Sequence, residues 1–184
     1  MTARLILVCH AAAARQPVFP ADEPLDEHSR AAATAIAGGL PVAKNYWTSP
    51  ELRAKETAHA LGLKAAEQPL LRDCDYGRWR GQSFKEVSAR EPSAIADWLR
   101  DPVATPHGGE SILALMGRVA QFLSGASRQR GESIVVTHPS IIRAAIVHAI
   151  DAAPNSFWRI DIAPLSLTRL SSTNGRWNVQ SMGS

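Results

Sequence analysis

The chain has 184 residues, of which 45% are hydrophobic and 20% are charged, and this length and balance predict one folded domain spanning residues 1–184. The net charge is only +3 and the basic residues are scattered, so we expect neither nucleic acid nor a membrane as a partner. The two cysteines form no CxxC pair, and the apolar run at 5–8 is too short for a signal peptide, so we expect a cytoplasmic location.

Up to residue 72, apolar runs and helical patterns alternate along the chain. The branched apolar residues at 4–8 are typical of a buried strand, while Asp26 and Gly38-Gly39 are suited to begin and end a helix. In chain order, the patterns predict a strand at 4–8, a proline-rich loop at 15–25, a helix at 26–38, a short strand at 45–48, a helix at 51–61 and an extended stretch at 67–72.

The segment 75–109 interrupts this alternation. It carries two helical pieces, at 83–90 and 93–100, which Pro92 separates, and it closes on Gly108-Gly109. We expect this segment to be a short cap over the sheet edge and not a separate domain.

The rest of the chain returns to strands and helices. The patterns predict a helix at 111–123, a strand at 133–137, a helix at 140–150, and strands at 157–163, 165–171 and 177–182. The complete order predicts an α/β fold: a three-layer α/β/α sandwich whose sheet is mostly parallel with an antiparallel edge. The sequence has neither a GxGxxG motif nor a P-loop, which disfavours an unrelated nucleotide-binding protein.

Two of the predicted parallel strands end in a histidine. The strand at 4–8 leads into Cys9-His10-Ala11, and the strand at 133–137 leads into His138-Pro139. Because the carboxyl ends of parallel strands meet at the ligand-binding edge of an open sheet, we expect the two imidazoles to lie close together. These histidines are therefore the first candidates for catalysis.

Further segments accompany the histidines in a fixed order. They are Thr48-Ser49-Pro50-Glu51-Leu52-Arg53, Leu71-Arg72-Asp73-Cys74-Asp75-Tyr76-Gly77, and Gly108-Gly109-Glu110-Ser111. In this order, from residue 4 to about residue 150, the chain resembles the histidine phosphatase superfamily, which includes phosphoglycerate mutases, α-ribazole phosphatases and protein phosphohistidine phosphatases. The resemblance implies a phosphoglycerate mutase-like fold and a metal-independent phosphatase that forms a phosphohistidine and needs no cofactor.

The resemblance also assigns roles to particular residues. His10 takes the place of the nucleophilic histidine, and His138 that of a second histidine, which hydrogen-bonds the phosphoryl group. Arg53 matches an arginine of the phosphate pocket, and Asp73 matches the acidic proton donor, which is usually a glutamate. Ser111 follows the Gly-Glu pair that shapes the substrate entrance in many relatives.

Elementary chemistry agrees with such a set of residues. Phosphoryl transfer needs an in-line nucleophile and donors around the equatorial oxygens, and neutral imidazole and arginine supply these. A carboxylic acid can protonate the leaving group and then activate water. The histidines and cysteines show no metal-ligand spacing, so we expect no metal. The short cap resembles that of the phosphatases more than that of the mutases, which implies hydrolysis, with a small phosphorylated molecule or a phosphohistidine protein as substrate.

The first motif departs from the family pattern, because Cys9-His10-Ala11 stands where relatives have Arg-His-Gly. Loss of one such contact to a transferring phosphoryl group typically costs roughly 3–4 kcal/mol in the barrier. Arg15 is the nearest replacement cation in the sequence, and the other candidates are Lys55, Arg78 and Arg80. The alternative function is therefore a catalytically impaired relative that binds a phosphorylated metabolite or anion without turnover.

Three more residues near these motifs have two interpretations each. His107 lies beside the Gly108-Gly109 turn, where it could contact substrate or be a plain loop residue. Arg143 lies in an apolar helix and is expected to form a structural ion pair. Cys9 is expected to be a small apolar filler rather than a reactive thiol.

Overall fold

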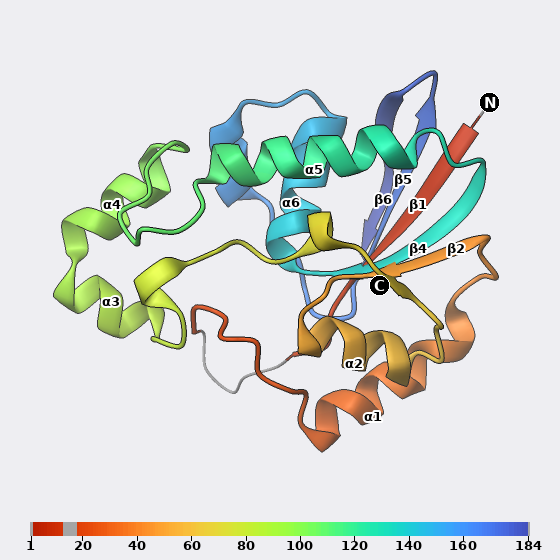
Figure 1. Cartoon of the computed structure of the whole chain (residues 1–184), viewed down its shortest axis with the longest axis horizontal. Helices are drawn as coiled ribbons and strands as arrows, with labels where there is room; N and C mark the ends of the chain where they lie inside the picture. Colours follow the sequence, from red (N-terminus) through yellow and green to blue (C-terminus); the bar gives the residue numbers. More distant parts are fainter. Residues whose placement is uncertain (1, 13–17, 184) are drawn as a thin grey trace.

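The computed structural model describes residues 2–12 and 18–183, and its centre is a six-stranded mixed sheet (Figure 1). The strand order is β3-β2-β4-β1-β5-β6; the first four strands in this order are parallel, and β5 and β6 are antiparallel to their neighbours. The strands are β1 (Thr2–Cys9), β2 (Asn45–Thr48), β3 (Ala66–Glu67), β4 (Gly131–Thr137), β5 (Leu167–Thr173) and β6 (Arg176–Gly183). The predicted α/β class with an antiparallel edge is confirmed.

Helices cover both faces of this sheet. Figure 1 shows α1 and α2 on one side and α5 and α6 on the other, so the sheet is the middle of three layers. The helices are α1 (Glu27–Ile36), α2 (Leu52–Ala60), α3 (Phe84–Arg90), α4 (Pro92–Arg100), α5 (Ile112–Ala126) and α6 (Pro139–Ala149). Among the described residues, no helix is both long enough and apolar enough to cross a membrane.

Strand β1 contributes to the core on both faces. Its side chains alternate between the two faces, as in any strand. Leu5, Leu7 and Cys9 join the core that contains the buried faces of α5 and α6, whereas Ile6 and Val8 join the core formed with α2. The continuous apolar run that predicted this strand therefore reflects burial on both sides, as expected for the centre of a covered sheet.

The register of the strands brings the predicted motifs to one edge. Cys9 pairs with Thr137 in the parallel ladder of β1 and β4, and Thr48 pairs with Val136 in that of β2 and β4. The backbone N–H of His10 then donates to the carbonyl oxygen of Thr137 at 2.8 Å. The residues that follow β1, β2 and β4 thus leave the sheet side by side.

Two of the predicted extended segments are wrong. Residues 157–163 form no strand, because Pro154–Arg159 is a 3₁₀ segment in which the buried Phe157 packs against Trp158, with ring centroids 4.8 Å apart. In the stretch 67–72 only Glu67 belongs to a strand. Pro69 lacks the N–H that a ladder requires and begins a 3₁₀ turn that runs through Leu71.

The cap segment is anchored by aromatic packing. Figure 1 shows α3 and α4 beyond the end of α5 at which that helix begins. Trp79 packs against Phe19 and Trp98 with ring centroids 5.2 and 5.7 Å apart, and Gly81 donates a backbone hydrogen bond to Phe19. The loop around Phe19 and the cap therefore support each other.

Gly109 is a position at which the fold tolerates no side chain. A Cβ there would overlap the carbonyl group of Asp75 and the backbone nitrogen of Gly77, none of which can move aside alone. We expect Gly109→Ala to lower the free energy of unfolding by about 2–4 kcal/mol, measured by urea denaturation. The matched control is Gly117→Ala in α5, where a Cβ meets no atom within 4 Å. Equal effects of the two substitutions would contradict the tight packing described for Gly109.

Candidate active site

Four of the residues singled out from the sequence meet where β1, β2 and β4 end. His10 follows β1, Arg53 lies in the first turn of α2, and His138 precedes the first residue of α6. Asp73 follows the 3₁₀ turn Pro69–Leu71. The ring centroids of His10 and His138 are 5.1 Å apart in an edge-to-face arrangement, and Arg53 contacts both His138 and Asp73.

His10 keeps one ring nitrogen free. Its Nδ1 lies 2.6 Å from the carbonyl oxygen of Ala11, so Nδ1 carries the proton and Nε2 retains its lone pair. The turn is held by Thr57, whose hydroxyl oxygen accepts from the N–H of Ala11 at 3.0 Å. Burial, together with the neighbouring His138 and the positive charge of Arg53, lowers the pKa of His10 to about 3. Such a neutral imidazole is suited to act as a nucleophile.

The low pKa of His10 leads to a direct prediction. A histidine whose folded pKa is lowered is neutral at every pH above that value, so the ring of His10 should not titrate between pH 8 and pH 5. NMR of the imidazole ring measures this, and the His10→Ala variant identifies the signal that belongs to His10. A titration midpoint above pH 5 for that signal would contradict the buried, neutral nucleophile.

His138 uses both ring nitrogens within the protein. The side chain is 0% exposed, and its Nδ1 accepts a hydrogen bond from Nε of Arg53 at 3.2 Å. The ring proton is therefore on Nε2, which lies 2.7 Å from the hydroxyl of Ser49 and 3.1 Å from Oε2 of Glu51. In this arrangement His138 orients Arg53.

Arg53 and Asp73 form a buried ion pair, with residue exposures of 3% and 8%. The other carboxylate oxygen of Asp73 accepts from the hydroxyl of Ser140 at 2.5 Å and from the backbone N–H of Cys74 at 2.8 Å. Burial alone would raise the pKa of Asp73, but His138, Arg53 and the hydrogen-bond donors Ser140 and Cys74 outweigh it and lower the pKa. Asp73 is thus held as a carboxylate, which does not favour the proton-donor role expected from the resemblance.

Glu51 belongs to the same group of residues, although the sequence analysis did not single it out. Its Oε2 accepts from Nε2 of His138 and from the hydroxyl of Ser49, and its Oε1 accepts from the backbone N–H of Asp73 at 3.1 Å. Burial would raise the pKa of Glu51, but the hydrogen bonds from His138 and Ser49 lower it to about 2. In the sequence Glu51 is one of several charged residues around the start of a helix, and nothing there shows its contact with His138.

The lowered pKa of Glu51 makes its contribution to stability dependent on pH. Its ordinary pKa is 4.5 and its folded pKa is about 2, so the stabilisation is complete above pH 4.5 and is lost as the pH falls towards 2. We expect Glu51→Gln to lower the free energy of unfolding at pH 7 and to flatten its decline between pH 5 and pH 2, measured by urea denaturation. Glu27→Gln, at an exposed position in α1, is the matched control. Parallel curves for Glu51→Gln and wild type would contradict this.

Arg118 of α5 hydrogen-bonds to the backbone segment that leads to Asp73. Its guanidinium donates to the carbonyl oxygens of Leu70 at 2.7 Å, Arg72 at 2.8 Å and Asp73 at 3.3 Å. Glu110 holds the same guanidinium through an ion pair at 2.7 Å. In the sequence Arg118 is an ordinary polar residue of an amphipathic helix, so its role becomes visible only in the fold.

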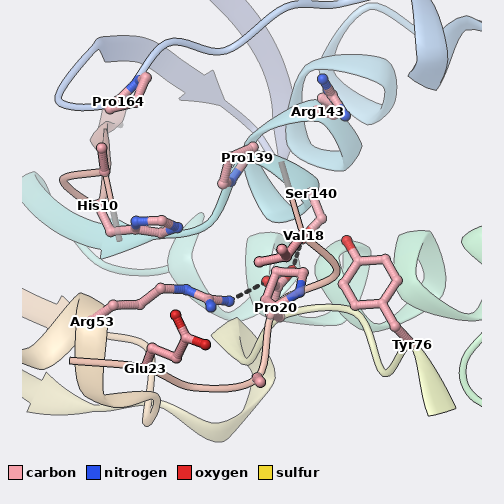
Figure 2. A pocket seen from close by; sticks show the side chains of 13 residues that line it. His10, Val18, Pro20, Glu23, Arg53, Tyr76, Pro139, Ser140, Arg143 and Pro164 are labelled. Carbon is pink, nitrogen blue, oxygen red and sulfur yellow. Dashed lines mark hydrogen bonds and ion pairs between the residues drawn. The ribbon is translucent and has the colours of Figure 1, made fainter. Parts of the chain in front are cut away.

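A cavity of about 280 Å³ opens beside His10 (Figure 2). Figure 2 shows the imidazole of His10, the guanidinium of Arg53 and the side chain of Ser140 around the same space. The lining residues are His10, Ala12, Val18, Pro20, Ala21, Glu23, Arg53, Asp73, Tyr76, Pro139, Ser140, Arg143 and Pro164. Among residues 2–12 and 18–183, no group of three or more His, Cys, Asp or Glu side chains is arranged to hold a metal ion.

Cys9, at the position where the resemblance predicts a motif arginine, lies in the core. Its side chain is fully buried among apolar residues, and this burial raises the pKa of the thiol to about 12. A thiol with so high a pKa is almost never ionised at neutral pH, so it is unreactive. The position therefore brings neither a positive charge nor a nucleophile to the cavity.

The cations that could replace the motif arginine lie in different parts of the structure. Arg15 is outside the described residues, Lys55 pairs with Glu67 and Arg78 pairs with Glu91. Arg80 lines a second cavity of about 180 Å³, which shares Arg53 and Asp73 with the first.

Arg143 lines the main cavity together with His10. Its Nε donates to the carbonyl oxygen of Ile160 at 2.6 Å, and its Nη2 lies 3.9 Å from a carboxylate oxygen of Asp161. These contacts fit the structural ion pair expected for Arg143, while the guanidinium also brings positive charge to the cavity.

The structure does not bring His107 or Ser111 to either cavity. His107 is 1% exposed and packs on Trp79 with ring centroids 4.9 Å apart, while its Nδ1 accepts from the N–H of Gly109 at 2.9 Å. Ser111 caps α5 by accepting from the N–H of Ala114 at 3.1 Å. Both residues stabilise the cap and the start of α5. The sequence motif alone does not distinguish this structural role from a role at the substrate entrance.

Comparison with known proteins shows how this chain is related to others. The model of the histidine phosphatase superfamily (branch 1) matches residues 5–184. A bifunctional protein of Mycobacterium tuberculosis is 33% identical over 131 residues, which are 65% of this chain and 35% of that protein. A glucosyl-3-phosphoglycerate phosphatase of Mycolicibacterium vanbaalenii is 30% identical over 148 residues, which are 73% of this chain and 64% of that protein. The chain thus spans about a third of the first relative and less than two thirds of the second.

Solved structures share the fold over almost the whole chain. A mycobacterial glucosyl-3-phosphoglycerate phosphatase superposes with a TM-score of 0.83 at 23% identity and 100% coverage of both chains. A phosphoserine phosphatase variant from Entamoeba histolytica, in complex with phosphoserine, superposes with a TM-score of 0.86 at 18% identity and covers 98% of this chain and 96% of its own. At these identities the likeness establishes the fold. With the family match to residues 5–184, it follows that the chain belongs to the histidine phosphatase superfamily.

Proposed function

We propose that this chain is a phosphatase that hydrolyses a small phosphorylated molecule through a phosphohistidine intermediate on His10. The observation that carries the proposal is that His10 has a neutral ring with an unprotonated Nε2 and lines a cavity together with the guanidinium of Arg53. A nucleophile and a fixed cationic donor beside one space are what phosphoryl transfer requires. The cavity of about 280 Å³ suits a small substrate better than a folded protein surface.

The proposed reaction has two steps. First, the lone pair on Nε2 of His10 attacks phosphorus, and the bond to the leaving group breaks with its electron pair going to that group. Nδ1 keeps its proton, which stays hydrogen-bonded to Ala11. Second, water attacks phosphorus, the P–Nε2 bond breaks, and its electron pair returns to the ring, while the protons of the water remain with the released phosphate and the solvent.

Arg53 is proposed to stabilise the charge that develops on the phosphoryl oxygens in both steps. His138 and Asp73 act through it: one receives Nε–H and the other receives Nη2–H, so the guanidinium plane has a single orientation. No metal ion and no cofactor is part of the proposed reaction. The names of the relatives, which are phosphatases of small phosphorylated molecules, support the proposal.

A second candidate function is anion binding without turnover, and the buried, uncharged Cys9 favours it. We also propose that the chain forms one domain and works in the cytoplasm. The free thiols of Cys9 and Cys74 support the latter, because an oxidising compartment favours disulfides.

The rate of hydrolysis of 4-nitrophenyl phosphate between pH 4 and pH 8, with calorimetry of orthovanadate binding, tests the two functions against each other. The phosphatase proposal predicts turnover that orthovanadate inhibits. Tight binding of orthovanadate without turnover would favour the anion-binding candidate. Absence of both turnover and binding would contradict both.

A further inference from the structure

The carboxylate at the interior of the cavity is surrounded by hydrogen-bond donors. Asp73 accepts from Arg53 through one oxygen and from Ser140 and the N–H of Cys74 through the other. All these partners are donors, and Nδ1 of His138, 3.6 Å from the first oxygen, is itself an acceptor of the Arg53 proton. A carboxyl group that served as general acid would need an acceptor for its own proton or an environment that favours the neutral form. The surroundings of Asp73 favour the charged form instead.

The other interior groups do not replace this acid. The hydroxyl proton of Ser140 is donated to Asp73. Figure 2 shows the hydroxyl of Tyr76 directed into the cavity, but burial raises the pKa of this phenol well above its ordinary value, so it can donate a hydrogen bond and retain its proton. Glu23 is the remaining carboxyl group of the cavity lining, and it lies exposed on the side of Arg53, away from Tyr76.

We propose, on the basis of the phosphatase function proposed above, that this site selects phosphoryl donors whose leaving group departs without a proton, such as acyl phosphates and phosphates of acidic phenols. In the first step the P–O bond breaks and the leaving oxygen carries the electron pair away as a carboxylate or phenolate. In solution the leaving group then stays ionised or takes a proton from water, according to its own pKa. Alkyl phosphates such as phosphoserine, whose leaving alkoxide is strongly basic, are poor substrates of the same site.

The test compares kcat/KM for acetyl phosphate, 4-nitrophenyl phosphate, phenyl phosphate and phosphoserine with the wild-type chain. A general acid typically contributes about 10²- to 10⁴-fold, and mainly to poor leaving groups. We therefore expect kcat/KM to fall at least about 100-fold from 4-nitrophenyl phosphate to phenyl phosphate, and further to phosphoserine. Acetyl phosphate should be hydrolysed at least as well as 4-nitrophenyl phosphate.

Two variants decide whether a carboxyl group takes part. Asp73→Asn and Glu23→Gln should each change kcat/KM for the two aryl phosphates by the same factor, so that their ratio stays as in wild type. Nearly equal rates with all substrates in wild type, or a selective loss on phenyl phosphate in either variant, would overturn the proposal. The comparison of substrates with the wild-type chain tests the proposal even if the Asp73→Asn variant folds poorly. Absence of hydrolysis of every substrate would refute the phosphatase function itself, which is a different result from equal rates.

Discussion

Replacing His10 with alanine is expected to reduce kcat/KM for 4-nitrophenyl phosphate by at least about 10³-fold. The physical reason is that the covalent step loses its nucleophile. His138 cannot take its place, because it is fully buried and both of its ring nitrogens are hydrogen-bonded within the protein. The measurement is the steady-state rate at pH 7 with purified variants.

The control for this substitution is His28→Ala, at an exposed position on α1 away from the cavity. It should leave the rate unchanged. His10→Ala should still bind orthovanadate, since Arg53 is intact, which separates loss of the nucleophile from loss of the fold. A His10→Ala variant that keeps most of its activity would show that another group attacks phosphorus.

Replacing Arg53 is expected to affect both stability and activity. Arg53→Met leaves Asp73 as a buried, unpaired carboxylate, so the free energy of unfolding should fall by about 3–5 kcal/mol. The same change removes the donor to the phosphoryl oxygens and should lower kcat/KM by about 10²- to 10³-fold. Urea denaturation and the hydrolysis assay measure the two effects on the same protein.

Two further variants separate these effects. Arg53→Lys keeps the positive charge but loses the planar fork that serves His138 and Asp73 at once, so it should retain more stability than Arg53→Met and still lose activity. The double variant Arg53→Met, Asp73→Asn removes both charges and should recover stability without recovering activity. If Arg53→Met is as stable as wild type, Asp73 is not held as an ion in the folded protein.

The parts of the fold that were predictable are those with a strong periodic pattern. The branched run at 4–8 and the strand before His138 could be recognised because both are buried on two faces. The segment around Phe157 was misread because its apolar residues pack through aromatic rings in a 3₁₀ turn, and periodicity does not separate that use of apolar residues from a strand. Pro69, in contrast, was a visible signal against an extended stretch.

Some residues of the candidate site could likewise be predicted from the sequence, and others could not. His10 and His138 follow strand ends, which the sheet topology brings together, whereas Arg53 and Asp73 were identified through the resemblance to the histidine phosphatase superfamily. Glu51 and Arg118 could not be identified, because their importance lies in contacts with His138 and with the backbone near Asp73 that are far away in sequence. The ionised state of Asp73 was equally hidden, since it depends on the hydroxyl of Ser140 and on Arg53.

The measurement that tests the central claim most directly is detection of the phosphorylated intermediate. The chain is mixed with 4-nitrophenyl phosphate, quenched in base within the first turnover, because phosphohistidine is labile in acid, and digested for mass spectrometry. We predict one phosphoryl group on the peptide that contains His10, and none in the His10→Ala variant. Turnover without any phosphorylated His10, or a phosphoryl group on a different residue, would contradict the account.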